Sequence, residues 1–235
     1  MKNYELSIVI PFYNEEKTIE PLADILINEL KKNNINYELV LVNNGSSDST
    51  PKIVDKLSNK YKDVKSVHVE INQGYGWGIL NGLRVATGEY VGYMDGDLEI
   101  SPEDIIKLYK RIKDTNADIG KGIRNHRERG ILKNIASSGF DVLFFILYSK
   151  FIKQVNANPK IMRKICYEKM NLKSKDWFID TEIIINGLEN NYKIVDHLVF
   201  YTPRESGESH IGFFKLFSTI AEYFKNIIKF KFFKN

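Results

Sequence analysis

The stretch "VGYMDGDLEISPEDIIKL", residues 91–108, decides the fold prediction. Its first residues continue an apolar run that predicts a buried strand, and two aspartates, Asp95 and Asp97, follow at once. Ser101 and Pro102 then have the residue types of a helix cap and a first helical turn. Ligands on sheets with alternating strands and helices bind beyond the carboxyl ends of the strands. The two aspartates stand at such a strand end.

The chain before this stretch alternates in the same way. Short apolar runs predict strands at 6–13, 37–44, 64–71 and 88–97. Helical spacing of apolar residues, together with capping residues, predicts helices within 15–33, 45–62 and 76–86. This alternation favours an α/β fold with a mostly parallel, Rossmann-like sheet flanked by helices.

The alternation weakens after about residue 118. Residues 121–134 are basic and predict a loop that leads into a helix. The later segments predict a helix with a broad apolar face, a strand or turn with a short helix, an acid-flanked helix and a strand, at 135–151, 154–170, 176–191 and 192–202. We therefore expect a soft boundary near residue 120 and no flexible linker.

The composition limits the class of protein. A chain of 235 residues with 43% hydrophobic residues suits one large domain or two closely packed lobes. Cys166 is the single cysteine, which excludes an internal disulfide, and the first residues do not resemble a signal peptide. These features predict a reducing, cytoplasmic compartment. The apolar run 140–151 is shorter than the about 20 residues that span a bilayer, and it contains Asp141 and Lys150.

Asp95 and Asp97 have two interpretations. Asp-Gly is common in turns, so the pair could simply shape a loop. Carboxylates crowded at a strand end, however, repel each other unless a cation lies between them, and Mg²⁺ or Mn²⁺ takes oxygen ligands and completes its shell with phosphate oxygens. Glu99 could add a third ligand, or it could be an ordinary acid of a first helical turn. A metal-bound diphosphate at this place implies a nucleotide.

A dinucleotide cofactor is the rival interpretation. "GYGWG" (74–78) follows a predicted strand and precedes a predicted helix, and Asp95 lies 21 residues beyond Gly74. The G-x-G-x-x-G fingerprint needs a glycine at position 79, which is Ile79. The first strand also ends without a glycine. A nicotinamide cofactor is therefore disfavoured, and close packing of helix on sheet is the structural explanation for these glycines.

Three segments occur in an order that resembles family 2 glycosyltransferases with the GT-A fold. They are "SIVIPFYNEEKTI" (7–19), "LVNNGSSDST" (41–50) and "NQGYGWGILNGLRVATGEYVGYMDGD" (72–97). "DGDLEISPED" (95–104) and "RESGESH" (204–210) make the chain most similar to polyprenyl-phosphate, or dolichyl-phosphate, hexosyltransferases. The resemblance covers about residues 6–210, and it departs from the family at Asn43-Asn44, where an acidic pair is usual, and at "VNANPK" (155–160).

The resemblance implies a reaction and a division of the chain. The reaction is metal-dependent, inverting transfer of a hexose from a GDP- or UDP-linked sugar to a polyprenyl phosphate, at the cytoplasmic face of a membrane and without nucleic acid. Residues 1–120 would bind the nucleotide sugar and 121–210 the acceptor, within one domain. Residues 211–235 would form a basic amphipathic helix.

The resemblance also implies roles for individual residues. Asp95 and the catalytic Asp97 would hold Mg²⁺ or Mn²⁺ with Glu99. The nucleotide sugar would contact Pro11, Tyr13, Glu15, Asn44, Asp48 and Gly76, although Asn44 and Asp48 could be turn and cap residues. The lipid phosphate would lie near Arg124, Lys133 and Ser137. Arg204 would clamp the donor diphosphate from a mobile segment that includes Ser209.

Two alternatives remain open. A saccharide hydroxyl acceptor, as in surface polysaccharide or glycan synthesis, needs a carboxylate base. "DWFIDTE" (176–182) offers Asp176, Asp180 and Glu182 for this role, with Trp177 to stack on a sugar ring, unless these acids only cap a helix. A catalytically inactive, membrane-docked protein is the other alternative; Asn43-Asn44 favours it and the intact "DGD" (95–97) argues against it.

The tail 211–235 holds five lysines and one glutamate, so its net charge is +4. This equals the net charge of the whole chain. Its apolar residues include Phe213, Phe214, Phe217, Phe224, Ile227, Ile228 and Phe232. Such a helix suits the headgroup boundary of a membrane. The alternative is a helix that packs on the body of the protein.

Overall fold

The computed structural model describes residues 3–124, 131–200 and 224–232. The strands are β1 (Leu6–Phe12), β2 (Tyr37–Asn44), β3 (Val64–Val69), β4 (Tyr90–Tyr93), β5 (Ile119–Arg124), β6 (Lys160–Arg163) and β7 (Ile194–Val199). The helices are α1 (Ile19–Lys32), α2 (Thr50–Lys60), α3 (Tyr75–Val85), α4 (Pro102–Thr115), α5 (Ile131–Tyr148), α6 (Lys164–Met170) and α7 (Ile179–Glu189). A C-terminal helix follows at 224–232.

The strands form one sheet in the order β3-β2-β1-β4-β6-β5-β7. β1 pairs in parallel with β2 and β4, β2 with β3, and β5 with β7. Among the pairings of the described strands, only those of β6 with β4 and β5 are antiparallel. The prediction of a mostly parallel sheet is confirmed, and both sides of the expected boundary near residue 120 contribute strands to it.

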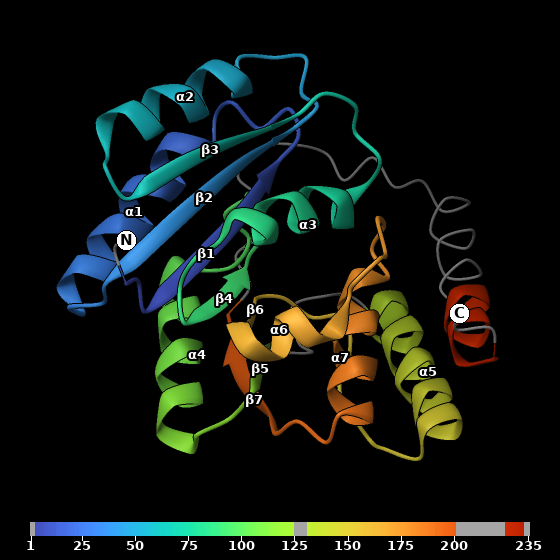
Figure 1. Cartoon of the computed structure of the whole chain (residues 1–235). Coiled ribbons are helices and arrows are strands. Elements are labelled where there is room, and N and C mark those ends of the chain that lie inside the picture. The colour runs from blue at the N-terminus through green and yellow to red at the C-terminus, as the bar shows by residue number, and fades with distance from the viewer. Residues whose placement is uncertain (1–2, 125–130, 201–223, 233–235) are drawn as a thin grey trace.

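Helices cover both faces of the sheet (Figure 1). One face packs against α1, α2 and α4, where Ile8, Ile10 and Leu39 meet apolar side chains of those helices. The other face packs against α3, α5, α6 and α7 and contains Val9 and Val42. Successive strand residues point to opposite faces, and here both faces are covered. This explains why the strands have continuous apolar runs in the sequence.

The predicted loop from residue 121 is wrong, because β5 continues to Arg124. Its sequence, "IGKGIR", did not indicate a strand because it contains two glycines and a lysine. Gly120 packs against Ile112 of α4, and Gly122 packs against the backbone of Asn158. Lys121 is buried and pairs with Asp196 of β7 at 3.0 Å. Packing and a buried ion pair therefore replace the apolar residues expected in a strand.

The fold places the ends of β1, β2 and β4 on one rim. The start of α4 confirms the predicted cap, because the Ser101 hydroxyl accepts from the backbone N–H of Glu103 at 3.3 Å and Pro102 opens the helix. No helix within the described residues is both long and apolar enough to cross a membrane. The C-terminal helix confirms helical structure for 224–232 of the predicted tail; residues 211–223 and 233–235 lie outside the described residues.

Candidate active site

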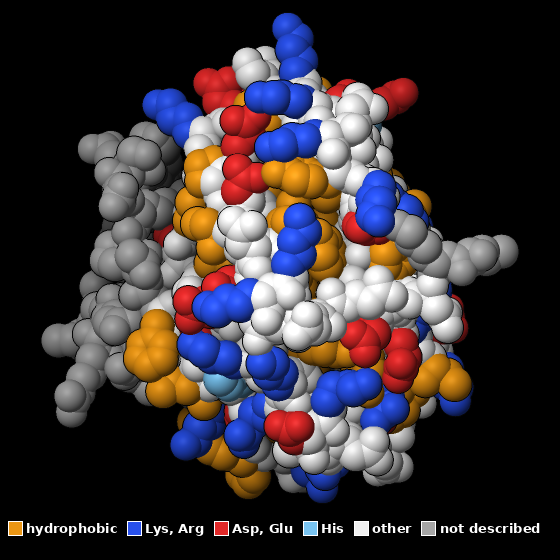
Figure 2. Space-filling model, turned by 90° about the vertical axis from the view of Figure 1, so that its left-hand side faces the viewer, with side chains coloured by type: hydrophobic (Ala, Val, Ile, Leu, Met, Phe, Trp, Pro, Cys, Tyr) orange, Lys and Arg blue, Asp and Glu red, His pale blue; other side chains and the backbone are white. Residues whose placement is uncertain are grey.

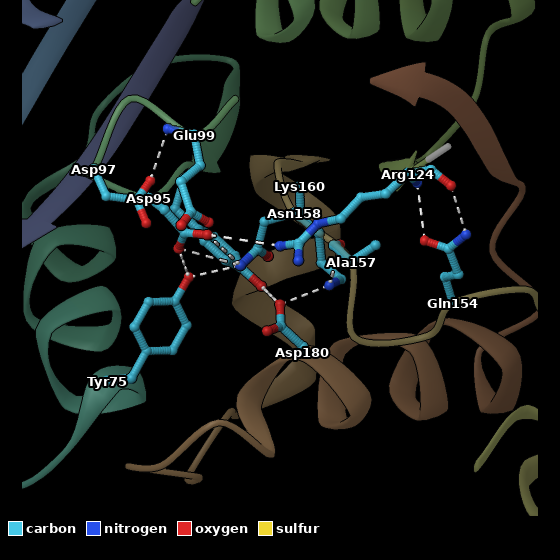
Figure 3. Close-up of polar contacts among 11 residues, drawn as sticks. Tyr75, Asp95, Asp97, Glu99, Arg124, Gln154, Ala157, Asn158, Lys160 and Asp180 are labelled. Atoms are coloured by element: carbon cyan, nitrogen blue, oxygen red, sulfur yellow. Dashed lines mark hydrogen bonds and ion pairs between the residues drawn. The ribbon is translucent and has the colours of Figure 1, made fainter. Parts of the chain in front are cut away.

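Asp95 lies just beyond β4 and is bonded by side chains from other parts of the chain (Figure 3). The Tyr75 hydroxyl donates to Asp95 Oδ1 at 2.5 Å. Asn158 Nδ2 lies 2.7 Å from the Tyr75 hydroxyl and 3.3 and 3.4 Å from the two oxygens of Asp95. The Asp95 side chain keeps 19% of its surface exposed. The first aspartate of the pair is thus held firmly and remains accessible.

The electrostatics of Asp95 fit a cation. Burial and the neighbouring charge of Asp97 raise the pKa of Asp95 to about 6, although Tyr75 and Arg124 act in the opposite direction. A hard divalent cation between Asp95 and Asp97 would relieve this repulsion, and carboxylate oxygens are the ligands it takes. Asn158 Oδ1 is also buried there without a hydrogen-bond partner among the described residues. The donor set therefore suits a metal ion.

Glu99 does not complete a metal site in this arrangement. Its backbone N–H donates to Asp97 Oδ1 at 3.1 Å, which shapes the turn after β4. Among the described residues, no three His, Cys, Asp or Glu side chains come together as ligands. The predicted third ligand is therefore not supported, and a cation at Asp95 and Asp97 would take its remaining ligands from a substrate or water.

Arg124 reaches the same place from the end of β5. Its Nη2 lies 3.9 Å from Asp95 Oδ2. Gln154 fixes the backbone there by accepting from Arg124 N at 2.9 Å and donating to Arg124 O at 2.8 Å. Arg124 Nε is buried and finds no acceptor among the residues that the structure describes. The Nε–H of Arg124 is therefore an unused donor beside the paired aspartates. Arginine N–H groups are the donors that commonly bind phosphate.

The loops after β1 and β2 are tied to each other. Asp48 accepts from the backbone N–H groups of Thr50 at 2.9 Å and Glu16 at 3.2 Å, with one oxygen each. The Glu15 N–H donates to the Thr50 hydroxyl at 3.2 Å. Burial would raise the pKa of Asp48, but these hydrogen bonds outweigh it and the pKa is lowered. Asp48 thus shapes the turn before Ser49, the N-cap residue of α2, and Glu15 contributes to the same link between the loops.

Asn44 ends β2 and lies against the start of α3. Its Nδ2 donates to Gly74 O at 3.0 Å, whereas its buried Oδ1 has no hydrogen-bond partner within the described part of the chain. Pro11 and Asn44 both approach Gly78 so closely that an added Cβ would lie 3.0 to 3.1 Å from them. Tyr13 is 54% exposed at the same rim. The predicted contacts Pro11, Tyr13 and Asn44 therefore lie near one another.

Gly76 packs closely against the loop 171–178, and its predicted contact with substrate stays a prediction. A Cβ at position 76 would lie 2.5 Å from Ser174 O and 2.6 Å from Asp176 O, so the loop 171–178 fills the space. The Trp77 N–H donates to Lys175 O at 2.9 Å. A carbonyl thus occupies the N-terminus of α3 where a dinucleotide fold would hold a pyrophosphate. This agrees with the absence of the full glycine fingerprint.

The acids of "DWFIDTE" have structural partners. Asp180 is buried, pairs with Lys160 Nζ at 2.6 Å and accepts from the Tyr93 hydroxyl at 2.5 Å. Burial lowers the pKa of Lys160 to about 8, and the Asp180 carboxylate opposes that shift. Glu182 accepts the N–H groups of Lys173 and Ser174, and Asp176 accepts that of Phe178. In this arrangement Asp180 is not accessible as a base, which corrects its predicted catalytic role.

Comparison with known proteins identifies the family. The sequence profile of glycosyl transferase family 2 matches residues 7–179. The chain belongs to this family. The glycosyltransferase is 30% identical, over 95% of its length, to an uncharacterized protein of Methanocaldococcus jannaschii, of which it covers 98%. It is also 30% identical, over 96% of its length, to the dolichol-phosphate mannosyltransferase of Pyrococcus furiosus, of which it covers 63%.

Solved structures confirm the GT-A fold of the glycosyltransferase. Glucosyl-3-phosphoglycerate synthase from Mycobacterium tuberculosis, in complex with Mn²⁺, UDP-glucose and phosphoglyceric acid, superimposes with a TM-score of 0.75 at 16% identity, covering 97% of this chain and 80% of that chain. The mannosyltransferase PcManGT from Pyrobaculum calidifontis, in complex with GDP-Man and Mn²⁺, gives 0.60 at 19% identity, covering 88% and 59%. At these identities the likeness concerns the fold.

The structure does not describe the side chains of several predicted residues of the glycosyltransferase. Lys133 and Ser137 lie in the first turns of α5, and their side chains are outside the described part. Arg204 and Ser209 lie outside the described residues altogether. Their predicted roles stay predictions.

Sequence reasoning missed Tyr75 and Asn158, which contact Asp95. Tyr75 lies in the glycine-rich segment that was explained by packing alone. Asn158 lies in "VNANPK", which was noticed only as a departure from the family.

Proposed function

We propose that the glycosyltransferase moves a hexose from a UDP- or GDP-linked sugar to a polyprenyl phosphate, with inversion and with Mg²⁺ or Mn²⁺. The observation that carries this proposal is the placement of Asp95, Asp97 and Arg124 at one rim of the sheet. Two carboxylates and a guanidinium at 3.9 Å from one of them form a place for a cation and a phosphate together.

The donor would bind through its diphosphate and its base. Asp95 and Asp97 would hold the ion, which would neutralise the charge that builds on the departing diphosphate. The free Oδ1 of Asn44 suits a ring N–H of the base, which uracil and guanine both offer. The dolichol-phosphate mannosyltransferase and the two structural neighbours support a nucleotide-sugar donor by analogy.

The acceptor is inferred from the three acids of "DWFIDTE", which already have hydrogen-bond partners within the described residues. Asp176, Asp180 and Glu182 each accept hydrogen bonds from within the protein. A hydroxyl acceptor needs a base, whereas a phosphate is already ionised and needs only a cation to position it. The phosphate oxygen would attack the anomeric carbon while the bond to the diphosphate oxygen breaks. Arg124, whose Nη2 lies 3.9 Å from Asp95 Oδ2, would orient that phosphate.

A lipid acceptor also fits the exposed apolar side chains. Val142, Phe145 and Ile146 project from one side of α5, each at least 48% exposed, and Phe151 follows at 61%. Ile228 and Phe232 of the C-terminal helix are exposed as well. The side of the molecule that carries α1 and α4 shows positive and negative side chains interspersed with hydrophobic ones (Figure 2). The apolar residues at α5 and the C-terminal helix are typical of contact with a membrane boundary.

One observation favours a saccharide acceptor as the second candidate. Trp177 is 51% exposed and stacks on Tyr75 with ring centroids 4.0 Å apart. Its position next to the Asp95 site would let an acceptor sugar ring stack on it. The three acids of "DWFIDTE" already accept hydrogen bonds within the protein, which disfavours this candidate.

Transfer of radiolabelled sugar tests both candidates. The full chain would be incubated with UDP- and GDP-linked hexoses, Mn²⁺, and either undecaprenyl phosphate, dolichyl phosphate or oligosaccharides. We expect label in an acid-labile lipid product, and at least a hundredfold loss in Asp97→Asn, comparable to the about 10²–10³-fold cost of removing one group that stabilises charge in a transition state. Asp114→Asn, at an exposed position of α4, is the matched control and should keep full activity. Transfer to oligosaccharide alone would overturn the lipid acceptor.

A further inference from the structure

Asp95 is oriented by two residues that lie far from it in the sequence. The Tyr75 hydroxyl of α3 donates to Asp95 Oδ1 at 2.5 Å. Asn158, which precedes β6, places Nδ2 2.7 Å from that hydroxyl and 3.3 Å from Asp95 Oδ1 (Figure 3). We propose that Tyr75 and Asn158 are positioning residues that fix Asp95 as a metal ligand. This inference rests on the proposed function.

Donors and acceptors can be assigned without conflict among Tyr75, Asn158 and Asp95. A phenol has a single hydrogen to donate, and here it goes to Asp95. The Asn158 amide has two, so it can donate one to the Tyr75 oxygen and the other toward the Asp95 carboxylate. Oδ1 of Asp95 accepts the short bond from Tyr75. Oδ2 has only the longer contacts with Asn158 Nδ2 at 3.4 Å and Arg124 Nη2 at 3.9 Å, so Oδ2 is the oxygen better placed to bind a cation.

Tyr75 is itself held in place from two directions. Its ring stacks on Trp177 at 4.0 Å with an angle of 15° between the planes. The loop that carries Trp177 is fastened to α3 by the bond from Trp77 N–H to Lys175 O, and to α7 by the Glu182 carboxylate. A rotation of the Tyr75 ring would have to displace this loop. The hydroxyl therefore reaches Asp95 from a fixed position.

Asn158 is equally constrained. Its side chain is almost fully buried, with 2% of the residue exposed. The next residue, Pro159, accepts from the Gly122 N–H of β5 at 2.8 Å, and Gly122 leaves room for the Asn158 backbone. Both partners of Asp95 thus come from rigid parts of the sheet and its helices, as a preorganised ligand requires.

Hydrogen bonds to a ligating carboxylate fix its direction, and their loss commonly weakens metal binding by about 10–100-fold. Tyr75→Phe removes one oxygen and keeps the stacked ring. We expect it to weaken Mn²⁺ binding about tenfold. Asn158→Ala should weaken it as well, and the double variant should lose less than the product of the two effects, because the residues form one network.

The experiment is a titration of the full chain with Mn²⁺, followed by electron paramagnetic resonance, in the presence of UDP and separately of GDP. Tyr109→Phe is the matched control, since this buried phenol on α4 has no hydrogen-bond partner among the described residues and should not alter binding. The melting temperature of each variant and its affinity for nucleotide without metal show whether the fold persists. A purely structural role of Tyr75 would change stability and leave the Mn²⁺ spectrum and affinity alone.

The outcomes separate the inference from the proposed function. If the wild-type chain binds no Mn²⁺ with either nucleotide, the proposed function fails. If the wild-type chain binds Mn²⁺ and both Tyr75→Phe and Asn158→Ala bind it equally well, the positioning role fails and the proposed function stands. Should Tyr75→Phe not fold, Asn158→Ala alone decides by the same comparison.

Discussion

At the residue scale, Glu38 is fully buried in β2 and connects this strand to β1, to β3 and to Thr87. Its carboxylate accepts from the Ser7 hydroxyl of β1 at 2.6 Å, and from the Thr87 N–H and hydroxyl at 2.8 and 2.9 Å. Lys65 of β3 pairs with it at 2.5 Å. A buried carboxylate is costly unless such partners satisfy it. Burial alone would raise the pKa of Glu38, but the bonds outweigh it and the pKa is lowered.

A lowered pKa makes Glu38 a source of acid-sensitive stability. A carboxylate whose pKa is lower in the folded state stabilises the protein above its ordinary pKa of 4.5, and this contribution disappears as the pH falls through the lowered value. Glu38→Gln should lower the free energy of unfolding at pH 7 by about 1–3 kcal/mol and flatten its decline below pH 4.5. Urea unfolding at several pH values measures both effects. Glu20→Gln is the control: it breaks a surface ion pair with Lys56 and should lower the free energy of unfolding by at most about 1 kcal/mol. If the free energy of unfolding falls equally steeply with pH in the wild type and in Glu38→Gln, Glu38 is not the source of the acid sensitivity.

At the scale of elements, α3 is placed by its glycines. Gly78 and Gly82 let the helix approach β1 and β2, and Gly76 lets the loop 171–178 approach the helix. Alanine is the better helix former by about 1 kcal/mol, so glycines at these positions indicate that space outweighs propensity. The loop that Gly76 admits carries Trp177, which stacks on Tyr75. The packing of α3 is thus connected to the orientation of Asp95.

Gly76→Ala should push this loop away from α3, because the new Cβ would lie 2.5 Å from Ser174 O. We expect a loss of stability of about 1–3 kcal/mol, as for other overpacked sites, and a change in Trp177 fluorescence. Gly139→Ala is the matched control: it lies in α5, with nothing within 4 Å of the added Cβ. It should be neutral or stabilise by up to about 1 kcal/mol. The same effect from both substitutions would show that helix propensity, and not the loop contact, is being measured.

The sequence allowed the first four strands, their helices and the rim with Asp95 and Asp97 to be predicted, since local apolar runs and caps determine these elements. The sequence did not predict β5, because Gly120, Lys121 and Gly122 interrupt the apolar pattern of a strand. It also did not predict that β6 lies between β4 and β5. Strand order after residue 118 depends on pairings between distant segments. Tyr75 and Asn158 were missed for the same reason: they lie 20 and 63 residues from Asp95 and meet it only in the folded chain.

At the scale of the whole molecule, the C-terminal helix joins the body and also continues its exposed apolar surface. Ile227 is fully buried, and Phe224 and Phe230 pack edge-on or tilted against Phe140 and Phe178. Ile228 and Phe232 remain exposed. One face of residues 224–232 therefore packs on the body of the protein, and contact of the other face with a membrane stays a prediction. Deletion of the tail would expose the core, so single exposed residues give a cleaner test of membrane contact.

Ile146 of α5, which is 67% exposed, is the residue to change. Insertion of an isoleucine into the acyl boundary stabilises binding by about 1.5–3 kcal/mol, so Ile146→Ser should lower partition to liposomes about tenfold or more. Ile71→Ser is the matched control, since Ile71 is 72% exposed after β3, away from α5. Sedimentation of the full chain with anionic liposomes measures the partition, and each lysine near the surface should add about 1 kcal/mol that rising salt removes. Equal sedimentation of both variants and the wild type would mean that α5 does not meet the membrane, and the lipid acceptor would then lose its support from the molecular surface.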